Sequence, residues 1–305
     1  MAHNNNYKNI ILIGASGYLG KHILAEFIAD PFFNVTVLTR ARSSATFPSN
    51  VNVIKIDYSD KKAIVKALVG QDVAISTTGV GGLTDNFDRT LIEAALEARV
   101  KWIIPDEFTL DTTHPLAAKV PVYISKMTIA ELLKKHQSQI AHTLISTGAF
   151  LDWGFDNGFL GFDITNRSVT LYDEGKHLIS GTTVPHIAKG VIAAIRHPEL
   201  TLNRRIFIAD ISFTQQQALA LLEKYTNAKW AVTNINTKDE LKNGEEYLKN
   251  GDFMKGIRSL IMSIAYNGEG ACYFEGKTSN KALELETDSL EKIVKEAVER
   301  NKAAH

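Results

Sequence analysis

The chain has 305 residues, of which 45% are hydrophobic and 22% charged, and its 34 basic and 34 acidic side chains give a formal net charge of zero. This length accommodates one large α/β domain together with a smaller one. Because DNA- and RNA-binding proteins ordinarily carry a basic excess that neutralises phosphates, the balanced charge argues against nucleic acid as a partner.

Six short runs rich in valine and isoleucine alternate with helical patterns in the first half of the chain. The helical patterns span 19–29, 91–98 and 124–133, with apolar residues at intervals of three and four. This alternation predicts parallel strands joined by crossover helices, which is the doubly wound Rossmann sheet of α/β proteins. The expected strands are 9–13, 35–38, 53–56, 73–76, 102–104 and 143–146.

The alternation loosens after Thr147. An aromatic- and glycine-rich stretch over 150–162 precedes a predicted hairpin at 173–176, which we interpret as the entry to a second domain. A helix over 185–195 and a strand over 204–208 are then expected to return to the Rossmann sheet.

Capping-box spacing predicts three more helices, which begin at Ser212, Thr237 and Asp288. The last is a C-terminal helix that ends near Arg300. No long linker separates the two predicted domains, so we expect them to pack around a cleft. The Rossmann domain is expected to comprise 1–153 with a returning segment at about 183–211, and a smaller α/β substrate-binding domain to comprise 154–182 and 212–305.

Three glycines with GxxGxxG spacing follow the first predicted strand and open the first helix. In this context Gly14 permits a tight turn, Gly17 lets a pyrophosphate approach the backbone, and Gly20 allows close packing of helix and strand. Glycines also serve in turns without a ligand, but their place at the first strand–helix junction predicts a dinucleotide site. The residues of this loop that we assign to the cofactor are Gly14, Ser16, Gly17, Tyr18, Leu19 and Gly20.

The end of the second predicted strand distinguishes NADP from NAD. NAD-binding enzymes usually place an acid there for the ribose 2′-hydroxyl, whereas an arginine accommodates the 2′-phosphate. The run over 37–44 has no acid but contains Arg40, with Ser43 and Ser44 as additional donors. The alternative is an ordinary solvated arginine. We predict NADPH/NADP as the cofactor.

The ends of the third and fourth predicted strands also carry polar residues. Asp57 is placed to reach the adenine amino group, although it could equally cap the next helix. Thr77, Thr78 and Gly79 are expected to line the cofactor groove, because the carboxyl ends of parallel strands meet at one edge of the sheet.

These features together resemble the atypical short-chain dehydrogenase/reductase branch that contains the isoflavone-reductase-like and NmrA-like proteins. The segment 104–108 is similar to the family segment usually written PSEF, 123–126 to its aromatic-x-x-lysine motif, and 146–150 to its Gly-x-Phe turn. The resemblance implies an NADPH-dependent reductase and adds Phe108, Lys126 and Gly148 to the cofactor site.

The resemblance also implies that Lys126 is catalytic. Ordinary short-chain dehydrogenases use a tyrosine four residues before the lysine, but Val122 stands there. In the reductases that this chain resembles, the matching lysine lies beside the nicotinamide and acts as general acid/base, directly or through water. Tyr123 lies three residues before Lys126 and could share its face, which leaves a part in proton transfer open, but we expect it to pack in the core. The alternative for Lys126 is a helix-surface lysine like Lys134.

Phe150 and Trp153 begin the aromatic stretch at the turn after the sixth strand, so they are candidate walls of an apolar substrate pocket, or core residues. Family substrates are often aromatic, which implies a small aromatic partner. The resulting hypothesis is hydride transfer from NADPH to an aromatic or conjugated molecule. The alternative is an NmrA-like redox sensor that binds NADP(H) without turnover.

Cys272 is the only cysteine, so the chain has no intrachain disulfide, and its histidines lack metal-ligand spacing. We expect no metal. The first apolar run, over 10–13, is too short for a signal peptide or membrane span. These features predict a cytoplasmic protein without a membrane partner, and no feature predicts an oligomeric state.

Overall fold

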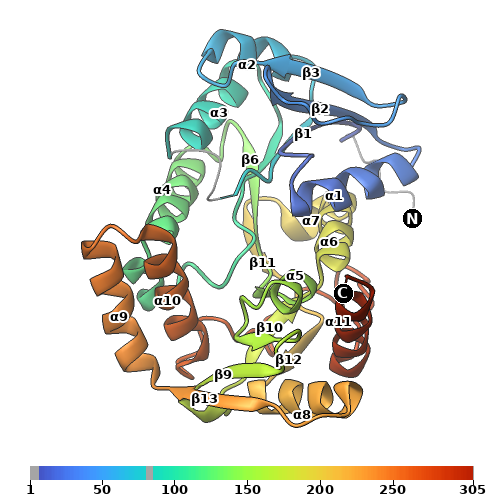
Figure 1. The fold of residues 1–305 in the computed structure, drawn as a ribbon. Helices are drawn as coiled ribbons and strands as arrows, with labels where there is room; N and C mark the ends of the chain where they lie inside the picture. Colours follow the sequence, from blue (N-terminus) through green and yellow to red (C-terminus); the bar gives the residue numbers. More distant parts are fainter. Residues whose placement is uncertain (1–6, 80–84, 305) are drawn as a thin grey trace.

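A sheet of seven parallel strands forms the centre of the computed structural model, which describes residues 7–79 and 85–304 (Figure 1). The strand order β11-β6-β5-β4-β1-β2-β3 changes direction beside β1, as in a doubly wound sheet. The predicted Rossmann class is therefore confirmed. The strands are β1 (Asn9–Ile13), β2 (Asn34–Arg40), β3 (Asn52–Ile56), β4 (Val73–Ser76), β5 (Trp102–Ile104), β6 (Ala141–Ser146) and β11 (Arg204–Phe207).

Helices cover both faces of this sheet because its central strands are apolar on both faces. In β1, Ile10 and Leu12 pack with helices α1 (Tyr18–Ala29) and α6 (Val184–Arg196), whereas Ile11 and Ile13 pack on the other side. All four side chains are fully buried. The second face is covered by α2 (Lys61–Leu68), α3 (Asp85–Glu97) and α4 (Pro121–Lys135), seen at the top (α2) and on the left (α3 and α4) of Figure 1.

Two three-stranded sheets and five helices form the lower half of the molecule in Figure 1. One sheet has the order β12-β10-β7 and the other β13-β9-β8. Their strands are β7 (Ala149–Phe150), β8 (Phe162–Asp163), β9 (Ser168–Tyr172), β10 (Ile179–Thr182), β12 (Ile211–Phe213) and β13 (Ala231–Ile235). The helices are α5 (Leu151–Asp156), α8 (Gln215–Thr226), α9 (Thr237–Lys249), α10 (Phe253–Tyr266) and α11 (Leu290–Ala304).

Both halves contribute to the core of the lower half. Leu110, Val120 and Tyr123 pack in the same cluster as Phe162 and Leu260. Residues from the range 1–153 therefore share a core with residues from 154–305. We retain the two-domain division as a proposal, with a shared core at the junction.

The predicted hairpin at 173–176 is wrong. The chain does turn there, but β9 pairs with β8 and β13, whereas β10 pairs with β7 and β12. Asp173 and Glu174 both have positive φ, 46° and 61°. The carboxylate of Asp173 accepts hydrogen bonds from the backbone N–H and hydroxyl of Thr237, at 2.9 and 2.5 Å. These contacts direct the turn toward α9 and away from a hairpin.

The helices predicted from capping boxes exist: α9 begins at Thr237 as predicted, whereas α8 and α11 begin two or three residues after the predicted Ser212 and Asp288. Thr214, rather than Ser212, caps α8 in a reciprocal capping box with Gln217. The side chain of Asn236 caps α9, and that of Ser289 accepts a hydrogen bond from the backbone of Lys292 in α11. In each helix the side-chain oxygen of the observed cap accepts a hydrogen bond from a backbone N–H of the first turn.

The predicted return of the chain to the Rossmann sheet is confirmed by β11, which pairs with β6. Arg205 of β11 points into the protein, where its guanidinium lies 2.6 Å from the carboxylate of Glu107. The Arg205 side chain is 11% exposed and the Glu107 side chain 2%. Arg205 also donates hydrogen bonds to the hydroxyls of Ser146 and Thr112, both at 2.8 Å. This buried pair connects the returning strand to the segment after β5.

Replacing Arg205 with alanine is expected to lower the free energy of unfolding by about 3–5 kcal/mol, because Glu107 would remain buried without its counter-charge. Denaturant unfolding followed by circular dichroism measures this loss. The matched control is Arg204→Ala, since Arg204 is the exposed neighbour in the same strand. Equal stability of the two variants would show that the pair contributes nothing specific.

Candidate active site

The glycine loop joins β1 to α1 in a geometry that two of its glycines require. Gly14 has φ +85°, in the left-handed region that side chains rarely adopt. A Cβ at Gly20 would lie 2.1 Å from the carbonyl oxygen of Gly14. A Cβ at Gly17 would have more room, because its nearest neighbour is 3.2 Å away. Gly20 therefore lets α1 approach β1 closely, as the sequence predicts, while Gly17 faces a more open space.

The N-terminus of α1 is left open toward this space. Its N-cap is Gly17, which offers no side chain, and its first turn contains no acidic residue. In α2, by contrast, the side chain of Asp60 accepts a hydrogen bond from the backbone of Ala63. Since the first turn of a helix presents N–H groups and a partial positive charge, α1 is suited to receive an anion.

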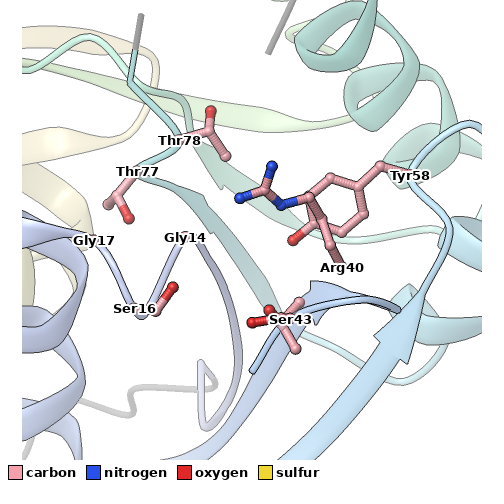
Figure 2. A pocket seen from close by; sticks show the side chains of 9 residues that line it. Gly14, Ser16, Gly17, Arg40, Ser43, Tyr58, Thr77 and Thr78 are labelled. Atoms are coloured by element: carbon pink, nitrogen blue, oxygen red, sulfur yellow. The ribbon is translucent and has the colours of Figure 1, made fainter. Parts of the chain in front are cut away.

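A hollow of about 130 Å³ lies between the glycine loop and the ends of β2 and β4. Figure 2 shows Ser16, the Arg40 guanidinium and the Ser43 hydroxyl around it. None of the described residues that line it is acidic. The lining residues are Gly14, Ser16, Gly17, Thr39, Arg40, Ser43, Tyr58, Thr77 and Thr78.

Thr39 and Tyr58 line the hollow although sequence reasoning did not select them. The Tyr58 hydroxyl donates a hydrogen bond to the carbonyl of Leu38 at 2.9 Å, and its ring stacks on Phe87 at 4.6 Å between centroids. Burial raises the pKa of Tyr58 to about 12, so it presents a neutral ring. The signal that could have identified Tyr58 is its place two residues after the end of β3.

The structure does not place Asp57 among the residues that line the hollow. Its carboxylate accepts hydrogen bonds from the backbone N–H and hydroxyl of Ser59, at 2.9 and 2.8 Å, and these bonds hold its pKa below the usual value. Asp57 also does not cap α2, because Asp60 does. The capping alternative for Asp57 is therefore wrong.

Lys126 lies near the middle of α4 with a side chain that is only 14% exposed. Its ammonium donates a hydrogen bond to the carbonyl of Asp106 and lies 3.4 Å from the Asp106 carboxylate. The same carboxylate accepts a hydrogen bond from the backbone N–H of Gly79, at 3.0 Å. Gly79 follows Thr77 and Thr78, so Lys126 is connected to one wall of the hollow.

Tyr123 lies in the shared core, as expected from the sequence. It is 4% exposed, and its hydroxyl accepts a hydrogen bond from the hydroxyl of Thr109 at 2.9 Å. Burial raises its pKa above the ordinary value for tyrosine. A buried phenol that is held neutral by its surroundings is poorly suited to exchange protons with a ligand.

The model of the NmrA-like family matches residues 6–291, which is most of the chain. The chain belongs to the NmrA-like family. The resemblance drawn from its motifs is thereby confirmed. Among its relatives, the oxidoreductase aprR of Aspergillus flavus is 34% identical over 291 residues, which cover 93% of this chain and 97% of that protein. Pinoresinol reductase 1 of Arabidopsis thaliana is 25% identical over 259 residues, covering 78% and 80%.

Solved structures share the fold of this NmrA-like protein across its length. The structure of AtPrR2 with NADP⁺ and (+)pinoresinol has a TM-score of 0.79 at 20% identity and covers 96% of this chain and 99% of that one. The NADPH complex of the quinone oxidoreductase QOR2 from Escherichia coli has a TM-score of 0.73 at 20% identity, with coverages of 94% and 99%.

Among the predicted site residues that do not line the hollow around the glycine loop are four later in the chain, namely Phe108, Gly148, Phe150 and Trp153. Phe108 is 7% exposed and packs in the core beside the sheet. Gly148 has φ +64°, and a Cβ there would meet the carbonyl of Ser180 at 2.2 Å, so its backbone position requires glycine. Phe150 and Trp153 are half-buried. A role for these four residues in binding cofactor or substrate stays a prediction.

Tyr18 and Leu19, at the start of α1, differ in their surroundings. Leu19 is 7% exposed and packs in the core. Tyr18 is 38% exposed, and burial together with the nearby carboxylates of Asp152 and Asp156 raises its pKa to about 12. Of these two residues, Tyr18 therefore presents its side chain to solvent and Leu19 does not.

No metal cluster is found in the part of the chain that the structure describes, where no three histidine, cysteine or acidic side chains come together. Within the same residues, none of the helices has the length and apolar character needed to cross a membrane. Cys272 is buried, and burial raises the pKa of its thiol to about 12.

The two glycines of the loop are expected to respond differently to alanine. Gly20→Ala forces a Cβ into the Gly14 carbonyl, so it should lower the free energy of unfolding by about 1–3 kcal/mol or more. The Cβ of Gly17→Ala would lie 3.2 Å from its nearest neighbour, so this substitution should lower the free energy of unfolding much less. Urea unfolding of both variants measures the difference. If the two variants are equally stable, the close packing of α1 on β1 is not what Gly20 provides.

Proposed function

We propose that this NmrA-like protein is an NADPH-dependent oxidoreductase that transfers hydride to an aromatic or conjugated small molecule. The observation that carries the proposal is the hollow that brings the open N-terminus of α1 together with Arg40 and Ser43. A relative that is 34% identical carries the name oxidoreductase, and structures of the same fold are titled as complexes with NADP⁺ or NADPH.

The residues of the hollow fit a phosphorylated dinucleotide. The first turn of α1 faces the pyrophosphate, and Gly17 leaves room for it. Arg40 presents a guanidinium for the 2′-phosphate, with the Ser43 hydroxyl as a second donor. Thr77 and Thr78 form the wall that leads from the hollow to Gly79.

In this proposal the reduced cofactor supplies hydride, and the chain supplies orientation and the proton. Lys126 is the proton donor, because its ammonium is only 14% exposed and is joined through Asp106 to the end of β4. A donor held in this way delivers its proton without a search over rotamers. The substrate would gain one hydride and one proton, the proton coming from Lys126.

The substrate class follows from the aromatic side chains beyond Gly148. Phe150 and Trp153 are half-buried, and the Trp153 ring lies 5.1 Å from that of Phe159. Flat apolar walls favour flat apolar ligands. The names of similar proteins agree with this class, since they include pinoresinol and isoflavone reductases.

The direct test is NADPH oxidation, followed by absorbance, against a panel of aromatic ketones, enones, quinones and lignan-type ethers. We expect turnover with at least one class and none without substrate. Tight NADPH binding without turnover across the panel would instead favour the redox-sensor alternative.

Arg40→Ala is expected to weaken NADPH binding by about 1.5–3 kcal/mol, because it removes a charge-assisted contact with the 2′-phosphate, and to leave NADH binding nearly unchanged. Fluorescence titration with both cofactors measures the two affinities. Arg42→Ala is the matched control, since Arg42 is an exposed arginine two residues away that does not line the hollow. Tighter binding of NADH than NADPH by the wild type would contradict the assignment.

Lys126→Ala is expected to lower kcat by about 10²–10⁴, the usual contribution of a positioned proton-transfer group, and to weaken NADPH binding much less. Tyr123→Phe keeps the buried ring and should leave kcat within a few fold. Lys134→Ala, at an exposed position of the same helix, is the control. An active Lys126→Ala beside an inactive Tyr123→Phe would transfer the proton role to Tyr123.

A further inference from the structure

Asp106 provides two anchors for the Lys126 ammonium. The two side chains are 16% and 14% exposed, and the carboxylate Oδ2 lies 3.4 Å from the Nζ of Lys126. The main-chain oxygen of Asp106 accepts a hydrogen bond from the same nitrogen. A lysine side chain has several rotatable bonds, so two anchors from one residue restrict its conformations strongly.

The Asp106 carboxylate also holds the chain at the end of β4. Its Oδ2 accepts a hydrogen bond from the backbone N–H of Gly79 at 3.0 Å. Gly79 has φ +65° and follows Thr78, which lines the hollow. One carboxylate oxygen is therefore shared between the lysine and the strand end beside the proposed cofactor.

The neighbouring acid gives the segment a fixed orientation. Glu107 has a different partner, since its buried carboxylate pairs with Arg205. The backbone N–H of Glu107 also donates a hydrogen bond to the carbonyl of Pro105, at 2.8 Å. With Glu107 held in the core, the preceding carboxylate is directed toward Lys126 and Gly79.

We propose that Asp106 is a positioning residue for the reduction, which holds the Lys126 ammonium and the end of β4 in one arrangement. The inference rests on the proposed function, in which Lys126 moves the proton. An ammonium carries three N–H donors, so the bond to the Asp106 carbonyl leaves others for the reacting molecule. Displacement of such a group by about 1 Å is enough to reduce a rate about 10²-fold.

A double-mutant cycle with Asp106→Asn and Lys126→Met tests whether Asp106 acts through Lys126. With the panel substrate that the wild type reduces fastest, we expect Asp106→Asn to lower kcat about 10- to 100-fold and NADPH affinity only a few fold. In the Lys126→Met background the same change should alter kcat less than about threefold, because the group it positions is gone. Asp106→Glu, which keeps the carboxylate, should recover part of the loss.

Asp111→Asn is the matched control. Asp111 is also mostly buried, lies in the same connection, and has a lysine partner, Lys277, at 3.8 Å. It should leave kcat within about threefold. Suppose that Asp106→Asn lowers kcat equally in the wild type and in Lys126→Met, or in neither. The positioning role of Asp106 would then be overturned, while the proposed function would stand. A fully active Lys126→Met would overturn the catalytic assignment of Lys126 as well.

The four proteins of the cycle also give a readout that needs no substrate. If the ion pair exists in solution, the shifts in the urea midpoint of the two single variants should not add in the double variant. Additive shifts would show that Asp106 and Lys126 are not coupled, which would overturn the proposal even if no substrate were found.

Discussion

The close approach of α1 to the ends of β1 and β4 is the constraint on which the proposed site depends. Gly20 can lie over the Gly14 carbonyl only because it has no side chain. On the other side of Gly14, the hydroxyl and backbone N–H of Thr77 both donate to the carbonyl of Ile13, each at 3.0 Å. These contacts bring the open end of a helix and the ends of two strands to one hollow, so that a pyrophosphate and a 2′-phosphate can be recognised together.

The sequence predicts the Rossmann sheet well because its central strands are buried on both faces and therefore appear as short, continuous apolar runs. It predicts the lower half less well. The pairing of β13 with β9 joins residues such as Ala231 and Ser168, which are far apart in the chain, and nothing in the local pattern at 173–176 indicates it. The hairpin prediction failed because a turn signal does not identify which strands pair, and here the polar contacts of Asp173 direct the chain to α9.

Within the candidate site too, the sequence predicts contacts between residues close in the chain better than contacts between residues far apart in it. Spacing locates the glycines and Arg40, because they belong to one β-α-β unit whose geometry is set by its own residues. It misses Tyr58 by one position, since choosing between Asp57 and Tyr58 requires the direction in which each side chain leaves the strand end. It also gives no indication that Asp106 and Lys126 meet, because they are 20 positions apart and the segment between them includes a short 3-10 helix, Pro115–Lys119, whose path depends on the shared core.

That shared core has a consequence for the chemistry. Lys126 and Tyr123 lie three residues apart on α4, yet Tyr123 packs with Phe162 and Leu260 of the lower half, whereas Lys126 faces Asp106 at the edge of the sheet. Helix α4 therefore packs on one side against the lower half, and through Lys126 it is held on the other side by Asp106, which follows β5. A change in the packing of the lower half would move Lys126 together with the helix, so the residues proposed to select the substrate would also influence the position of the proposed proton donor.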